Sequence, residues 1–331
     1  MLHLIQQCII LQDMTIAQIM ACTCLIGLLL LAGAFTYEHI AERRDATQHP
    51  APGRLIQVGD HRLHLFCQGS NSPTVVIEQG AGSPSPLWWP VQEKIASFAH
   101  VCTYDRAGYL WSEPVRRPRS VRERSEELHA LLTHAGVPGP YLLVAHSYGG
   151  LIIREFALLY PAETAGLVLV DTPDEPALCR PEVQKFYERM RIFVKIQEAA
   201  SRFGLPRLLR KIPSMQEALW FVRPDDYAAA ADDLLSLRSL DCSSPAPGQL
   251  KDLPLAVLTH GRPFPGPFAL LEEGWLAAQH RLAALSGRST LTTADSSNHM
   301  IHLDQPELVI DLVRQMHGVV SQKSIDSAQL A

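Results

Sequence analysis

The chain has 331 residues, of which 47% are hydrophobic and 19% are charged, so it can bury one large core or two modest ones and is not a disordered tail. Its formal net charge of -5 at pH 7 gives no basic excess, which argues against nucleic acid as a partner. Seven cysteines are too few for a disulfide-stapled scaffold. These numbers are typical of a globular protein, although its amino-terminal residues are more hydrophobic than the rest of the chain.

Residues 14–37 form a run without charge between Asp13 and Glu38. As a helix they would extend about 36 Å, enough to cross the roughly 30 Å hydrocarbon layer of a bilayer. We therefore expect a single-pass membrane anchor within an amino-terminal segment of residues 1–44. The alternative is a cleaved signal peptide and a secreted or periplasmic protein, because residues 32–34 have the small-x-small form of a cleavage site. Residues 1–13 lack the Lys or Arg with which such a peptide begins.

The sequence gives conflicting indications of the side of the membrane on which the main domain lies. Arg43 and Arg44 follow the apolar run, and the positive-inside rule would put the main domain in the cytoplasm. The cysteines beyond the anchor allow two disulfides outside the cytosol and equally allow buried thiols inside it. These cysteines are Cys67, Cys102, Cys179 and Cys242.

Strand patterns begin after a polar, Pro-containing stretch at residues 45–53, which we interpret as a linker. Residues 54–58 and 63–66 alternate apolar and polar side chains around Gly59-Asp60 and predict a hairpin. Short apolar runs follow, as expected of parallel strands buried on both faces. These runs are residues 74–77, 101–104, 141–145, 166–170, 255–259 and 289–293.

Helical patterns separate these runs. Ser120 and Glu123 form a capping box that opens a helix ending at Gly136. Further helices are predicted at residues 151–160 and 306–320. The alternation predicts an α/β fold with a mostly parallel central sheet and helices on both faces, over residues 54–320, followed by a tail at residues 321–331.

The interval between the strands ending at Val170 and starting at Leu255 is too long for a crossover. We expect an inserted helical cap at about residues 173–250. Its first part is basic and is either a solvated face or a contact with an anionic membrane surface. The basic residues are Lys185, Arg189, Arg191, Lys195, Arg202, Arg207, Arg210 and Lys211.

A nucleophile is predicted where an apolar strand meets a helix. Ser147 follows the run 141–145 and is flanked two residues away on each side by Ala145 and Gly149. This is the nucleophile-elbow pattern with Ala in place of the first Gly, and its small residues allow strand and helix to approach closely around a strained serine. The alternative is a tight turn that contains a serine by chance.

The remaining members of a triad are expected after later strands. His299, behind the last strand, is the predicted base, and its neighbour His302 is expected to pack or cap the next helix. The loop after residues 255–259 contains no acid in its first ten residues. We therefore predict that Asp171, at the end of the previous strand, is the acid. The alternative is that its side chain only stabilises the loop in which it lies. Asp174, Glu175, Glu272 and Glu273 are the other acids considered.

An oxyanion hole needs two backbone N–H groups. The residue after the nucleophile, Tyr148, should supply one, and Ala81 in the glycine-containing loop 78–82 the other. Trp88 and Trp89 follow closely and either line an apolar substrate pocket or begin a helix packed on the sheet.

In this order, the hairpin, elbow, late histidine and cap resemble the α/β-hydrolase fold superfamily over residues 54–320. Residues 104–112 look like the turn after its fourth strand, and residues 303–307 like the opening of its last helix. The chain departs from the pattern at Ala145, at Gln79, where the oxyanion loop often carries His, and in lacking an acid after the seventh strand. Asp171 is similar in position to the acid of some haloalkane dehalogenases, which use Asp as nucleophile, so Ser147 argues against dehalogenation.

The resemblance implies hydrolysis of an acyl bond, most simply a carboxylic ester of a small molecule, through an acyl-serine. We expect neither a metal nor a cofactor. One alternative is a peptidase that releases amino-terminal residues, with acids in the cap to hold the free amine. These acids would be Asp225, Asp226, Asp232 and Asp233. The other alternative is a binding protein that keeps the fold without turnover.

Overall fold

The computed structural model describes residues 2–212 and 223–329. The chain divides into two compact units. One contains residues 1–50 and 196–224, and the other contains residues 51–195 and 225–331. The division assigns part of the predicted cap to the same unit as the amino-terminal segment, a grouping that residue spacing did not indicate.

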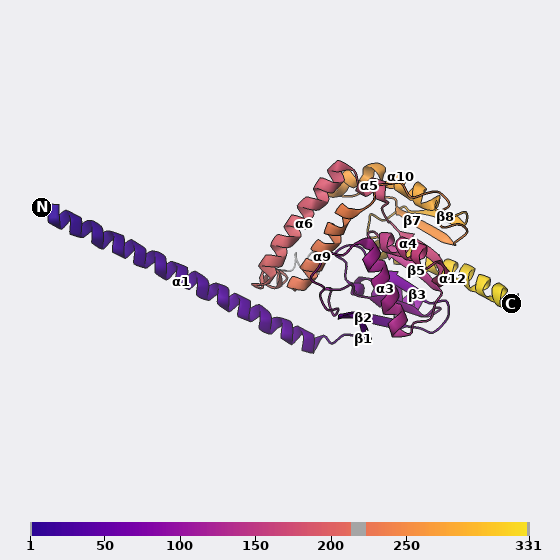
Figure 1. Cartoon of the computed structure of the whole chain (residues 1–331), viewed down its shortest axis with the longest axis horizontal. Helices are drawn as coiled ribbons and strands as arrows, with labels where there is room; N and C mark the ends of the chain where they lie inside the picture. Colours follow the sequence, from indigo (N-terminus) through magenta and orange to yellow (C-terminus); the bar gives the residue numbers. More distant parts are fainter. Residues whose placement is uncertain (1, 213–222, 330–331) are drawn as a thin grey trace. The chain divides into compact units, whose positions relative to one another are not determined.

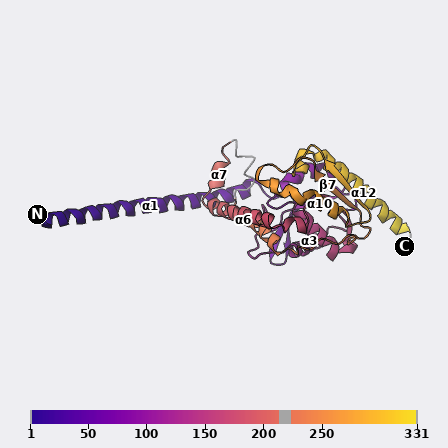
Figure 2. The ribbon, with the colours of Figure 1, turned by 90° about the horizontal axis from the view of Figure 1, so that it is seen from above.

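The first unit is dominated by α1 (Leu2–Gln48), one uninterrupted helix (Figures 1 and 2). From Thr15 onward it is long and apolar enough to cross a membrane, and none of its most apolar stretch is buried in the protein. The predicted linker is too long at its start, because residues 45–48 continue the helix. They contain no helix breaker, and the first proline is Pro50.

The end of α1 is packed by the other segment of this unit. That segment holds residues 196–201 of α6 (Pro181–Ser201) and α7 (Leu205–Leu209). The ring of Phe203 lies 6.5 Å from that of Phe35. Arg207 donates to Glu38 at 2.8 Å and to Asp45 at 2.5 Å. These ion pairs give α1 a defined partner at the point where its uncharged run ends.

The second unit is built on an eight-stranded sheet with the order β1-β2-β4-β3-β5-β6-β7-β8. β1 pairs with β2 and β2 with β4 in antiparallel fashion, and every later pairing is parallel. This confirms the predicted hairpin and the mostly parallel sheet. The strands are β1 (Arg54–Val58), β2 (His61–Gln68), β3 (Val75–Glu78), β4 (Val101–Tyr104), β5 (Tyr141–His146), β6 (Thr164–Val170), β7 (Leu255–His260) and β8 (Ser289–Ala294).

Helices cover both faces of the sheet. One core cluster joins sheet residues to α3 (Val121–Ala135), α4 (Gly149–Leu159) and α10 (Glu272–Ala283). The other joins them to α2 (Trp89–Ile95) and α12 (Pro306–Gln329). The remaining helices are η1 (Ser85–Trp88), η2 (Pro161–Glu163), α5 (Glu175–Leu178), α9 (Pro224–Ser236), η3 (Leu237–Ser239), η4 (Gly266–Leu271) and α11 (Ile301–Asp304).

Local signals in the sequence set several helix boundaries. Ser120 accepts a hydrogen bond from the Glu123 N–H while the Glu123 side chain accepts from the Ser120 N–H, and Gly136 ends α3 with φ at 67°. The capping box and the glycine C-cap are therefore confirmed. The predicted tail is partly wrong, because α12 continues from its predicted end at residue 320 to Gln329. Residues 321–329 include no Gly or Pro to stop it.

Disulfide bonds join Cys67 to Cys102 and Cys179 to Cys242. The first links residues directly opposite each other on β2 and β4. The second links the end of α5 to the segment that follows η3. Of the two possibilities left open by the sequence, the structure thus contains the disulfides rather than four thiols.

Candidate functional site

Ser147 occupies a sharp turn between β5 and α4. Its φ of 51° lies in the left-handed region, where a residue with a side chain is strained. The glycines that follow are required by close packing. A Cβ on Gly149 would lie 2.6 Å from the Gln79 carbonyl oxygen, and one on Gly150 would lie 2.1 Å from a Thr172 methyl carbon. The small residues of the motif thus allow α4 to start directly against the sheet, which presents Ser147 at the carboxyl end of β5.

The structure brings Ser147, His299 and Asp171 together in one hydrogen-bonded chain. His299 Nε2 lies 2.9 Å from Ser147 Oγ. His299 Nδ1 lies 2.6 Å from Asp171 Oδ2. Ser147 and His299 are partly exposed, whereas Asp171 is fully buried. A hydroxyl, an imidazole and a carboxylate in this order can move a proton away from the hydroxyl and stabilise the resulting imidazolium.

Asp171 follows β6 directly and has further donors. The backbone N–H of His260 and the indole N–H of Trp275 both donate to Asp171 Oδ1, at 3.1 Å and 2.9 Å. His260 Nδ1 lies 2.7 Å from Oδ2. Burial by itself would raise the pKa of Asp171, but the hydrogen bonds from His260 and His299 outweigh it and lower that pKa. The carboxyl group therefore stays ionised although it is closed to water.

Glu272 and Glu273, the acids that follow β7, have partners other than His299. Glu272 accepts a hydrogen bond from the Phe264 N–H at 3.0 Å and lies 3.3 Å from His260 Nε2. Glu273 forms an ion pair with Arg180. His260 itself was missed by sequence reasoning, which examined this loop for acids alone. The signal was a histidine in the place where a carboxylate was sought.

Both segments that carry a predicted oxyanion donor reach the edge of the sheet where Ser147 lies. β3 and β5 are parallel neighbours, with Glu78 opposite Ala145, so the loop after β3 reaches the same edge of the sheet as the elbow. A Cβ on Gly80 would lie 3.4 Å from Ser147 Cβ. Ala81 follows in this loop, and Tyr148 is the N-cap residue of α4, where N–H groups have no acceptor within the helix.

The contacts of Trp88 and Trp89 favour the second alternative, a helix start packed on the sheet. Trp88 is fully buried, and its ring stacks on that of His302 at 4.4 Å. Trp89 contacts the rings of Phe66 and Trp111, at 5.6 Å and 5.8 Å. These are the contacts of a helix start packed on the sheet, and they place Trp88 in the core instead of on an open pocket wall. His302 is buried there as well, and the imidazole within hydrogen-bond distance of Ser147 Oγ is that of His299.

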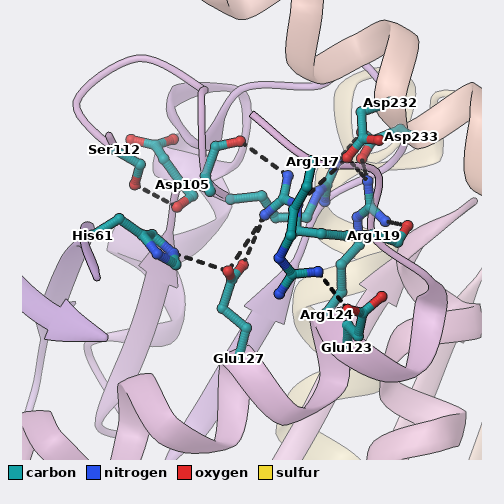
Figure 3. A network of polar contacts seen from close by, with 12 residues as sticks. His61, Asp105, Ser112, Arg117, Arg119, Glu123, Arg124, Glu127, Asp232 and Asp233 are labelled. Carbon is teal, nitrogen blue, oxygen red and sulfur yellow. Dashed lines mark hydrogen bonds and ion pairs between the residues drawn. The ribbon is translucent and has the colours of Figure 1, made fainter. Parts of the chain in front are cut away.

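Two of the cap acids, Asp232 and Asp233, are paired with arginines of the same unit. Asp233 on α9 pairs with Arg106 at 2.8 Å and with Arg124 at 3.2 Å. Its neighbour Asp232 pairs with Arg124 at 2.7 Å and with Arg119 at 3.4 Å (Figure 3). Arg119 continues the network to Glu127, which in turn contacts His61 (Figure 3). Asp226, another of the cap acids, accepts from the Leu110 N–H at 2.8 Å.

One group of metal-ligand type was found among the described residues: Cys67, His100 and Cys102. Its two sulfurs are joined in a disulfide, which removes the thiolates that a metal would bind.

The chain matches the model of the alpha/beta hydrolase family over residues 75–312. It is 30% identical over 242 residues to an uncharacterized protein, YqjL, of Bacillus subtilis (strain 168), covering 73% of this chain and 82% of that protein. A thermophilic esterase from Thermogutta terrifontis, 22% identical, superposes with a TM-score of 0.62, covering 81% of this chain and 98% of that one. The Cif epoxide hydrolase from Acinetobacter nosocomialis, 16% identical, superposes with a TM-score of 0.66, covering 85% and 96%. The two structures share the fold, and the family match covers both the elbow and the histidine loop. The chain therefore belongs to the alpha/beta hydrolase family.

Proposed function

We propose that the protein is a serine hydrolase that cleaves a carboxylic ester through an acyl-serine intermediate. The observation that carries this proposal is the chain of hydrogen bonds from Ser147 through His299 to Asp171, on a strained elbow. A serine hydroxyl is a weak nucleophile until an adjacent base removes its proton. His299 Nε2 is within hydrogen-bond reach of that proton, as a general base must be.

The acylation step follows from these contacts. Ser147 Oγ attacks the carbonyl carbon of the ester while its proton passes to His299 Nε2. Asp171 accepts the Nδ1–H of His299, fixes its tautomer and stabilises the imidazolium. The N–H groups of Ala81 and Tyr148 are the proposed donors to the oxyanion of the tetrahedral intermediate. His299 then gives its proton to the departing alcohol, which leaves the acyl group on Ser147.

Deacylation repeats the sequence with water as the nucleophile. His299 takes a proton from water, the resulting hydroxide attacks the acyl carbon, and Ser147 Oγ leaves and regains its proton from His299. The carboxylic acid product is released. All the proton transfers use the same histidine nitrogen, so no further acid or base is required.

The solved structures that share the fold include an esterase and an epoxide hydrolase, so the fold alone does not choose the bond. The serine at the elbow supports acyl transfer, since its acyl ester can be hydrolysed by water activated at the same histidine. The peptidase alternative loses support, because Asp232 and Asp233 are already neutralised by arginines. A free amine would have to displace those cations. A binding protein without turnover would not need the strained serine.

The test is labelling by a fluorophosphonate probe together with hydrolysis of short-chain aryl esters. The native protein should be labelled at Ser147, and Ser147→Ala should lower kcat by about a thousandfold or more while the protein stays folded. His299→Ala should behave alike. His302→Ala is the matched control and should keep most of the activity. Activity of Ser147→Ala within about tenfold of native would overturn the mechanism.

We further propose that α1 anchors the protein in a membrane with the hydrolase domain on the oxidising side. The exposed apolar side chains of α1 support the anchor. The two disulfides support the side, because such bonds persist outside the cytosol and are rare within it. This argument outweighs the hint from Arg43 and Arg44, whose charge bias is small. The basic stretch of the cap gives less support to lipid contact, since Arg191 and Arg202 pair with nearby acids.

Alkaline carbonate extraction tests the anchor, and the native protein should remain with the membrane. A soluble form that begins near Phe35 would instead show cleavage of a signal peptide. Maleimide labelling of unpermeabilised cells, with a cysteine added after Ala331, tests the side. Labelling without permeabilisation is expected, and labelling that requires permeabilisation would place the domain in the cytosol.

A further inference from the structure

Arg106 lies in the loop after β4 and is almost completely buried. It donates from Nη1 to the carbonyl oxygen of Gln79 at 2.8 Å and from Nη2 to that of Gly80 at 2.7 Å. These carbonyls belong to two successive peptides of the loop after β3. One rigid, planar guanidinium thus fixes two neighbouring peptide planes.

Fixing a carbonyl also fixes the N–H on the other side of the same peptide bond. In a trans peptide the C=O of one residue and the N–H of the next point in opposite directions. Because the Gly80 carbonyl points at Arg106, the Ala81 N–H points away from Arg106. In the described part of the chain, that N–H makes no hydrogen bond, which leaves it free for an oxyanion.

Arg106 is in turn held by the cap helix α9. Asp233 Oδ2 accepts from Arg106 Nη2 at 2.8 Å and from the Tyr109 hydroxyl at 2.6 Å. The same oxygen lies 3.4 Å from the N–H of Gly82, next to Ala81. Asp233 is fully buried, so water does not screen these contacts. On its other side, Arg106 Nη1 donates to Glu78 at 2.5 Å.

Tyr148, the second proposed oxyanion donor, also contacts α9. The side-chain hydroxyl of Tyr148 lies 2.7 Å from Ser236 Oγ, at the end of α9. The guanidinium carbons of Arg106 and Arg124 lie 5.5 Å and 5.8 Å from the centre of the Tyr148 ring. Both loops that carry a proposed oxyanion donor therefore contact α9 or a cation that α9 neutralises.

We propose that Asp233 of the cap helix, acting through Arg106, is a positioning residue that orients the Gly80–Ala81 peptide toward the oxyanion. This rests on the proposed acyl-serine mechanism and adds that the oxyanion loop and the cap helix act as one unit. Without the ion pair to Asp233, the guanidinium of Arg106 is held less firmly against the Gln79 and Gly80 carbonyls. The peptide that bears the Ala81 N–H can then rotate. The expected consequence is a weaker oxyanion hole around an intact triad.

The test is Asp233→Asn in the full chain, assayed with an aryl ester and the matching thionoester. The sulfur of a thionoester is a poor hydrogen-bond acceptor, so its hydrolysis depends less on oxyanion donors. Loss of one such donor costs roughly a hundredfold to a thousandfold in kcat, and a loosened donor should cost about tenfold. We expect kcat for the ester to fall about tenfold with KM nearly unchanged, and the ester-to-thionoester ratio of kcat to fall about fivefold or more.

Asp232→Asn is the matched control. It makes the same chemical change at the neighbouring position of α9, where the carboxylate pairs with Arg124 and Arg119 but has no contact with Arg106 among the described interactions. It should destabilise the protein and leave the ratio unchanged. If both variants lower the ratio equally, a general loosening of the cap is responsible and the specific role of Asp233 is wrong.

Tyr109→Phe covers the case in which Asp233→Asn does not fold. It removes only the hydroxyl that donates to Asp233 and accepts from Gly82, and the ratio should fall about twofold to threefold, as for loss of one modest hydrogen bond. A folded, active variant of Asp233 or Tyr109 with an unchanged ratio overturns this inference alone. Absence of Ser147-dependent hydrolysis in the native protein overturns the proposed function, and this inference with it.

Discussion

Asp171 and Asp233 are both fully buried carboxylates of the hydrolase unit, yet their partners differ in kind. Asp171 accepts from two imidazoles, an indole and a backbone amide. Asp233 faces two guanidinium groups and a phenol. Burial raises the pKa of each carboxyl, and in each case the partners outweigh burial and lower it. The two therefore reach the same ionisation state by different means.

The difference lies in what the partners can do. An arginine keeps its charge at every physiological pH, so the charge of Asp233 is permanently compensated and serves to hold structure. An imidazole gains its charge only when it takes a proton, so Asp171 can stabilise His299 at the moment a reaction needs it. Substitution of a carboxylate paired with an imidazole should therefore lower kcat far more than substitution of a carboxylate paired with arginines.

The largest effect is expected at Asp171. Asp171→Asn preserves the shape of the side chain but presents an amide to His299 Nδ1 and removes the charge that stabilises the imidazolium. We expect kcat for an ester substrate to fall by roughly a hundredfold to ten-thousandfold with KM nearly unchanged. Steady-state kinetics on the purified variant measure this.

Glu272→Gln and Glu273→Gln are the controls for Asp171, because they are the acids of the region after β7. Each should lose less than about tenfold in kcat, since loss of one ordinary hydrogen bond is worth about 1 kcal/mol. Full activity of Asp171→Asn together with a crippled Glu272→Gln would transfer the role of the acid to the region after β7.

Asp174 is a carboxylate paired with an arginine, so it tests the structural role in this comparison. It caps α5 by accepting from the Ala177 N–H and forms an ion pair with Arg281 at 2.5 Å, so its partner carries a fixed charge. Asp174→Asn should lower the free energy of unfolding by about 2 kcal/mol, which combines a weakened cap with loss of a partly buried ion pair. Its kcat should change by less than about tenfold. Chemical denaturation measures the first quantity, and a kcat loss like that of Asp171→Asn would contradict the distinction.

A smaller effect is expected at His260, the second imidazole on Asp171. His260→Gln removes the ring that lies 2.7 Å from Asp171 Oδ2 and leaves the backbone N–H in place. We expect kcat to fall about tenfold without a change in KM, equivalent to about 1.4 kcal/mol for one hydrogen bond to a charged acceptor. An unchanged kcat would show that His299 and Trp275 hold the carboxylate sufficiently by themselves.

The smallest effect at neutral pH is expected at His302. Burial, and then the proximity of His299, lowers the pKa of His302 to about 3. Below about pH 6.5 the unfolded chain takes up a proton that the folded protein does not, so this residue destabilises the fold progressively as pH falls from 6.5 toward 3. His302→Phe keeps a ring against Trp88 and removes that proton. Relative to native, its free energy of unfolding should rise by about 1 kcal/mol between pH 7 and pH 5.5.

Thermal unfolding of both proteins across this pH range measures the difference, and the variant should keep most of its esterase activity. A stability difference that does not grow on acidification would show that His302 is protonated in the folded protein. The same experiment on His260 would have the opposite sign. Burial lowers its pKa, but hydrogen bonding to Asp171 prevails and raises it, so its contribution is complete below about pH 6.5 and is lost as pH rises through the folded pKa.

Several features could be predicted because they depend on neighbours in the chain. The capping box at Ser120 involves residues three apart, and the strands β3 to β7 are mostly apolar runs. The elbow is also local, since the residues next to Ser147 decide whether strand and helix can meet so closely. The end of α1 was missed because nothing in residues 45–48 distinguishes a polar linker from a polar turn of helix.

By itself, the sequence determined the α/β class, the strand order along the chain, and the positions of Ser147 and His299 relative to it, because hydrophobic period and turn chemistry are written in adjacent residues. The tertiary structure alone decided which cysteines pair, that His260 and Trp275 share Asp171 with His299, and that Arg106 joins the loop after β3 to α9. These contacts join residues far apart in the chain. Their geometry depends on the twist and register of the folded sheet, which no local pattern encodes.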